Sequence, residues 1–239
     1  MGSGEMGNQN IHDRLQRASS WINAANALQS GQEHAEFVFL FIAFNALYGR
    51  RQYEGSKNEA ATDRVEFLRR VMKMVDYDKR LGQHRLHLAL KDCRKEAGEL
   101  IVNYFLRDSY WRREQRSKEL IQQFRSEQRR ADERLSHGKF EDLLELVLKR
   151  LNVLRNQVVH GCVTYGPSSK GFPSSEAGLA VLRKLVPALY QLMDKHGRHL
   201  EWPVIPYPRV GSEFHPVSMS CINSPPSKPL ALLSMRRVG

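Results

Sequence analysis

The sequence predicts an all-α protein: a helical bundle with an irregular, proline-rich C-terminal tail. Apolar residues recur at helical spacing along most of residues 10–200, and no convincing run of alternating apolar and polar residues indicates strands. Prolines crowd the chain beyond Trp202 and forbid helix there. We therefore expect a flexible N-terminus or tag at 1–9, a helical domain at 10–200 and an extended tail at 201–239.

Periodicity predicts helices over residues 10–30, 33–48, 62–77, 86–106, 140–160 and 179–196. Residues 33–48 are apolar on nearly all sides, which is typical of a helix at the centre of a bundle. Asn45 in that helix is expected to be a buried hydrogen-bond anchor that could reach Arg155 or Asn156. Pro187 is a candidate kink in the last helix.

The charge favours polyanionic partners. The chain has 37 Lys and Arg against 26 Asp and Glu, a formal net charge of +11 and a pI near 9.8, so nucleic acid is a natural partner. In the charged helical insertion at 107–137, Arg and Lys alternate with Asp and Glu; this pattern fits either a solvated, salt-bridged helix or a basic arm along a phosphate backbone. The candidate RNA-binding residues are Arg112, Arg113, Arg116, Arg129, Arg130, Lys149 and Arg150.

Cysteine usage and hydropathy indicate a cytoplasmic protein. Cys93, Cys162 and Cys221 lie far apart and form no CxxC pair, which favours reduced thiols. The N-terminus lacks the basic and apolar regions of a signal peptide, and the apolar run 35–47 is too short to span a bilayer. We expect no membrane partner.

The helix 140–160 carries the candidate site. At about 100° per residue, Asn156 lies roughly 170° and His160 roughly 150° from the centre of its apolar stripe, while Arg155 lies about 70° away, at the margin. His160 is therefore expected to face away from the core, and Gly161 to end the helix. Two simpler explanations remain open: cations at a helix C-terminus that favour the dipole, and an ordinary solvated face. The stripe consists of Phe140, Leu143, Leu144, Val147, Leu151, Leu154 and Val158.

Arg155-x4-His160 at the end of a helix, with the polar Asn156 after the Arg, resembles the motif of the HEPN superfamily. The apolar helix from Phe37 to Tyr48 also resembles an early helix of defence-type and Apea-like members. The resemblance implies a metal-independent endoribonuclease that needs no cofactor, because RNA supplies its own 2′-OH nucleophile. His160 would act as general base or acid, Arg155 would stabilise the scissile phosphate and Asn156 would orient either one.

Residues five apart on a helix diverge by about 140°, so Arg155 and His160 of one chain do not converge on one atom. HEPN proteins pair their motifs across a shared cleft, which implies a homodimer with a composite site. The resemblance also implies a role in phage defence or as a toxin, with a neutralising or regulatory protein partner. The sequence departs from toxin members that continue His-x-Tyr, since Gly161 and Cys162 follow His160. The alternative function is a non-catalytic HEPN-type module that binds RNA, nucleotides or a protein.

Other motifs are weaker. Cys162 lies too close to His160 to form a nucleophile–base pair with it. Glu33, His34 and Glu36 fit an acidic helix N-terminus better than a metal site. The segment Gly166–Gly171 lacks the GKS/T ending of a phosphate loop. No zinc-ligand cluster is visible.

Overall fold

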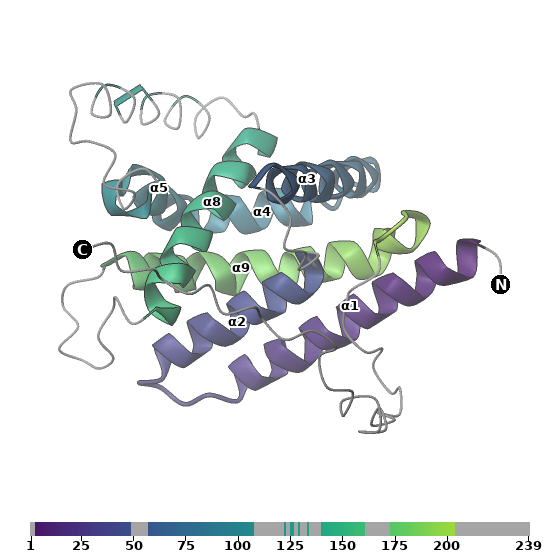
Figure 1. The fold of residues 1–239 in the computed structure, drawn as a ribbon, viewed down its shortest axis with the longest axis horizontal. Helices are drawn as coiled ribbons and strands as arrows, with labels where there is room; N and C mark the ends of the chain where they lie inside the picture. The colour runs from purple at the N-terminus through teal and green to yellow at the C-terminus, as the bar shows by residue number, and fades with distance from the viewer. Residues whose placement is uncertain are drawn as a thin grey trace, which may run out of the picture.

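The computed structural model describes residues 3–48, 57–107, 140–160 and 173–203, and single positions between 108 and 139. Within these ranges the regular elements are all helical, which confirms the predicted fold class (Figure 1). The helices are α1 (Ser3–Asn26), α2 (Glu33–Tyr48), α3 (Lys57–Arg80), α4 (Arg85–Asp92), α5 (Arg94–Val102), α8 (Phe140–Val159) and α9 (Pro173–His196), with short 3-10 turns η1 (Tyr104–Leu106) and η2 (Gly197–His199).

Helix α9 lies at the centre of the bundle. It contacts all six of the other described helices, and Figure 1 shows it running between α1 and α2 on one side and α3, α4 and α5 on the other, with α8 crossing over. Its buried residues occur at helical spacing and include Val181, Leu185 and Leu189. The prediction that the helix at 33–48 occupies the centre was wrong, because α2 leaves Val38 and Phe39 only partly buried.

Asn45 of α2 is exposed, so it is not the buried anchor that we expected. It follows Phe44, which is buried, and one position along a helix turns the side chain by about 100°. Because nearly every other residue of the segment is apolar, the sequence pattern did not show that this side of α2 is exposed.

Several helix boundaries differ from the prediction, since α3 spans Lys57–Arg80 rather than 62–77 and α9 begins at Pro173 rather than near residue 179. Helix α1 begins at Ser3 rather than near residue 10, and Gln9 supports its early turns by donating to Asp13 Oδ1 at 2.8 Å. The helix predicted over 86–106 is divided at Cys93 into α4 and α5, both of which pack on α9. The interruption at Cys93 lets the apolar faces of α4 and α5 both pack on α9, and the spacing of apolar residues alone does not predict it.

Residues 197–203, which directly follow α9, pack against the core. Trp202 is buried, its indole donates to the Gly197 carbonyl at 2.8 Å, and its own carbonyl accepts from Asn10 Nδ2 at 2.8 Å. Arg14 is 0% exposed and donates to the carbonyls of Leu47 (3.2 Å) and Pro203 (2.7 Å). Burial, followed by the charges of Arg70 and Arg17, lowers the pKa of Arg14 to about 10, so it stays charged at neutral pH.

Gly178 lets α9 approach α8 and α2 closely. A Cβ at this position would overlap Cδ2 of Leu154 and lie 3.1 Å from Cε2 of Phe37. Leu154 and Phe37 are themselves buried, so neither has free space to move into. The absent side chain therefore sets how near the C-terminal half of α8 comes to α9.

We expect Gly178→Ala to lower the free energy of unfolding by about 1–3 kcal/mol, because overpacking outweighs the helix propensity of roughly 1 kcal/mol that alanine gains. Urea unfolding measures the change, with Lys184→Ala on the exposed face of α9 as the control. Combining Gly178→Ala with Leu154→Ala should cost less than the sum of the two changes. An unchanged midpoint for Gly178→Ala would contradict the close packing.

Candidate functional site

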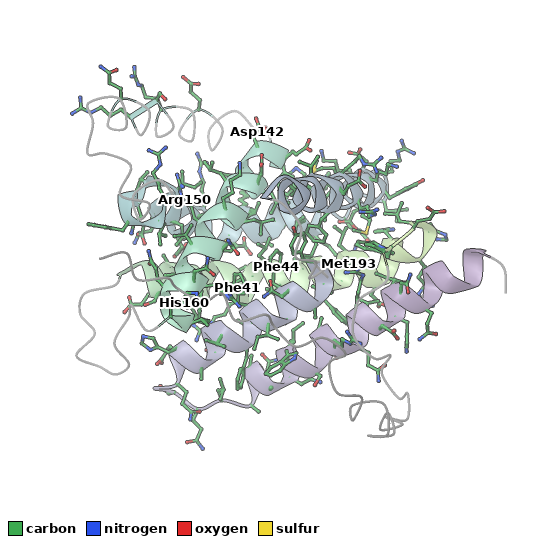
Figure 2. All side chains as sticks on the ribbon, viewed as in Figure 1. Phe41, Phe44, Asp142, Arg150, His160 and Met193 are labelled. Atoms are coloured by element: carbon green, nitrogen blue, oxygen red, sulfur yellow. The ribbon has the colours of Figure 1, made fainter. Side chains whose placement is uncertain are left out.

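The C-terminal turn of α8 carries the three residues of the predicted motif. Helix α8 begins with Glu141 and Asp142, whose charges favour the helix N-terminus. Helical hydrogen bonding continues to its end, where the His160 N–H donates to the Asn156 carbonyl at 3.0 Å. Figure 2 shows His160 at this end of α8, with Phe41 of α2 nearby in the view. The predicted helix is confirmed, with its last helical residue at Val159.

Arg155 is held from two directions. Its Nη1 donates to Asn156 Oδ1 at 2.9 Å, and its Cζ lies 6.0 Å from the centre of the Phe41 ring. Both Arg155 and Asn156 are half-buried. The ring contact and the hydrogen bond to the neighbouring amide both favour this position of the Arg155 guanidinium.

His160 lies on another side of the helix end and is exposed. Arg155 turns toward α2, whereas the helical period places His160 about 140° away, roughly 60° from the buried Gln157. The two side chains thus leave α8 in directions about 140° apart. The helix positions both side chains but does not aim them at one point.

Two polar side chains fix this helix end against η1: Gln157, which the sequence did not single out, and Arg150, which was expected to bind RNA. Gln157 Nε2 donates to the Phe105 carbonyl at 2.9 Å, and Arg150 Nη1 donates to the Leu106 carbonyl at 3.2 Å. The exposed fractions of Gln157 and Arg150 are 5% and 6%. Residues seven apart share a helix face, so a polar pair at this spacing beside the apolar stripe was the signal that could have identified them.

The predicted RNA-binding residues separate into three groups. Arg150 is buried and binds a backbone carbonyl, so its assignment as a surface contact to phosphate was wrong. Lys149 is exposed and pairs with Glu145 at 2.8 Å, and Arg129 is exposed. The remaining candidates lie outside the described residues: Arg112, Arg113, Arg116 and Arg130.

The acidic start of α2 is occupied by contacts within the protein. Glu36 forms a two-pronged ion pair with Arg183 of α9, with both N–O distances at 2.6 Å. Hydrogen bonds from the backbone N–H groups of Glu33 and Gly31 lower the pKa of the Glu33 carboxyl. Among the residues that the structure describes, no group of three His, Cys, Asp or Glu side chains could hold a metal ion.

Cys162 and the segment 166–171 fall outside the described ranges. In the described part of the chain, no helix has both the length and the apolar content needed to cross a bilayer.

The chain matches no family model, no curated protein and no solved structure. The likeness to HEPN proteins therefore depends on the two sequence segments given above. Function has to be argued from the chemistry of the site.

We expect Arg150→Ala to lower the free energy of unfolding by about 1.5–3 kcal/mol, since it removes a buried charged donor and leaves the Leu106 carbonyl unpaired. Thermal and urea unfolding measure this change. The adjacent, exposed Lys149 provides the matched control, and Lys149→Ala should change stability by no more than about 0.5 kcal/mol. A stable Arg150→Ala protein that only loses RNA affinity would restore the surface role instead.

Proposed function

We propose that this protein is a metal-independent endoribonuclease whose active site is built from the α8 termini of two copies. The observation that carries the proposal is the pairing of a fixed cation with an accessible imidazole at one helix end. Asn156 and Phe41 hold Arg155 in place, while His160 stays exposed. If Arg155 and His160 only interacted with the helix dipole, Arg155 would not need its two contacts and His160 would not need to be exposed.

The chemistry matches what RNA cleavage needs. The 2′-oxygen attacks the adjacent phosphorus, the bond from phosphorus to the 5′-oxygen breaks, and a 2′,3′-cyclic phosphate and a 5′-OH result. In each site, His160 of one copy takes the proton of the 2′-OH and delivers it to the leaving 5′-oxygen, while Arg155 comes from the other copy. The Arg155 guanidinium stabilises the negative charge that develops on the phosphorane oxygens, and Asn156 keeps it oriented.

A second copy would bring together groups that one chain holds apart. Val159 lies on the helical wheel between Arg155 and Asn156 and is 51% exposed. An exposed aliphatic side chain in the middle of the proposed site offers an apolar contact for the paired helix. We therefore place Val159 at the dimer contact, with Arg155 and His160 on either side of it.

Attraction to RNA would come mostly from basic residues outside the described ranges. The ranges 3–48, 57–107, 140–160 and 173–203 hold 21 Lys and Arg against 18 Asp and Glu, so they contribute little to the net charge of +11. Residues 108–139 alone hold nine Lys and Arg against six Asp and Glu. A nuclease of this type needs control, and we extend the proposal to a cytoplasmic defence or toxin role with a regulatory protein partner.

Purified protein should cleave single-stranded RNA in EDTA, and His160→Ala should reduce the rate by about 10²–10⁴-fold, the usual contribution of a general acid or base. Arg155→Lys should also lose most of the activity, because lysine lacks the planar fork of donors. His199→Ala serves as the control, since His199 is exposed and lies in η2, beyond the C-terminal end of α9. Mass spectrometry of the RNA ends identifies the cyclic phosphate. If the protein cleaves no RNA, the proposal is wrong.

Mixing the inactive Arg155→Ala and His160→Ala proteins tests the composite site. If each site combines Arg155 of one copy with His160 of the other, each mixed dimer keeps one intact site, and about one quarter of the wild-type activity should return. A site contained within one chain predicts no recovery. Native mass spectrometry of the mixture, which separates the mixed dimer from the two parent dimers by mass, confirms that the subunits exchange.

We expect Val159→Asp to shift the protein toward monomer and to lower cleavage in parallel, because two carboxylates would be buried at the dimer contact. Light scattering over a concentration series measures the mass. Leu88→Asp on α4 is the matched control, since Leu88 is 53% exposed. If Val159→Asp leaves the dimer intact, the contact lies elsewhere.

A further inference from the structure

A groove lies between α1 and α9, far from the proposed active site. Figure 1 shows the N-terminal half of α1 beside the C-terminal end of α9, and Figure 2 shows His160 at the opposite end of the molecule. The volume of the groove is about 750 Å³, within the range of about 300–1,000 Å³ that is usual for small-molecule sites. The groove is therefore large enough for a ligand unrelated to RNA cleavage.

The groove has an apolar floor and one aromatic wall. Ile11 and Leu15 of α1 form the floor and are 1% and 6% exposed. Tyr190 of α9 is half-buried and packs against the core. Within the part of the chain that the structure describes, its side chain takes part in no hydrogen bond, ion pair or ring stacking. The floor and the Tyr190 ring together fit an apolar, preferably aromatic, group of a ligand.

The α9 side of the groove carries one charge of each sign. Asp194 Oδ1 and Arg198 Nη2 lie 3.8 Å apart, and the two side chains are 53% and 67% exposed. This distance is too long for a hydrogen bond, unlike the 2.6 Å contacts between Glu36 and Arg183. Both charged groups of the groove therefore keep their hydrogen-bonding capacity. A ligand that complements them carries a cation and an anion close together.

We propose that this groove binds the zwitterion of a free aromatic α-amino acid. The ammonium of the ligand pairs with Asp194, its carboxylate pairs with Arg198, and its ring lies on the apolar floor beside Tyr190. An α-amino acid holds its two charges on one carbon atom, as the neighbouring carboxylate and guanidinium require. A peptide holds its terminal charges far apart, and a fatty acid lacks the ammonium, so neither complements the pair.

The spacing along α9 selects the side chain of the ligand. Tyr190 and Asp194 are four residues apart, so their Cβ atoms are about 5–6 Å apart on one face of the helix. A ligand whose ammonium lies at Asp194 therefore needs a side chain of several atoms to reach the Tyr190 ring. An aromatic side chain has this length, whereas the methyl group of alanine does not.

Calorimetric titration of the full chain tests the proposal, with L-phenylalanine as the probe. L-phenylalanine should bind with saturation. Three analogues should each bind at least about tenfold more weakly, a loss of about 1.4 kcal/mol: 3-phenylpropionate lacks the ammonium, 2-phenylethylamine lacks the carboxylate and L-alanine lacks the ring. Equal binding of 3-phenylpropionate would overturn the proposal, and so would the absence of saturable binding for phenylalanine, tyrosine and tryptophan.

Variants assign the binding to this groove. Asp194→Asn should remove the preference for phenylalanine over 3-phenylpropionate, and Arg198→Gln the preference over 2-phenylethylamine. Tyr190→Leu should weaken phenylalanine binding about tenfold and leave alanine binding unchanged. Asp76→Asn and Arg94→Gln are the matched controls, since both residues are exposed on other helices. If the groove variants bind like the wild type, the site lies elsewhere and the proposal is wrong. Circular dichroism melting confirms that the variants are folded.

Discussion

The close crossing of α9 with α8 and α2 is the constraint on which the rest of the structure depends. It exists because Gly178 has no side chain at the point where Leu154 and Phe37 meet α9. Arg155 follows Leu154 directly, and Phe41, which lies under its guanidinium, is one turn beyond Phe37. The packing of Leu154 and Phe37 against Gly178 therefore also determines where the Arg155 guanidinium lies.

The end of α8 is braced differently on its two margins. On one margin an aromatic ring and an amide hold Arg155. On the other, Gln157 holds the Phe105 carbonyl, while His160 remains exposed. A permanent charge is most effective when it is preorganised, whereas a proton carrier must reach both the reacting oxygen and solvent. The asymmetry of the two margins thus corresponds to the different demands that the two chemical roles make.

Periodicity predicted the helix that carries the site well, because its apolar stripe is regular and Leu144, Val147, Leu151 and Leu154 are buried as expected. It failed for Arg150 and Gln157, which are buried with the stripe although their side chains are polar. Their burial is determined by carbonyls about fifty residues earlier in the chain, so the spacing of the polar pair could mark the two residues but not identify the acceptors that they bind. Trp202 was assigned to the extended tail for the same reason, although it is buried and bonded to Asn10 and Gly197.

Two buried arginines add to the net charge of the protein but are not accessible to a phosphate group. Arg14 binds the Leu47 carbonyl near the end of α2, and Arg150 binds the Leu106 carbonyl at the end of η1. Each satisfies an acceptor that the end of a helical element leaves unpaired, so neither charge is available to phosphate. If the protein is the ribonuclease that we propose, its phosphate contacts weaken with salt while the proposed proton transfers at His160 do not depend on them directly, so raising the salt concentration should lower RNA binding before it lowers the rate of the chemical step.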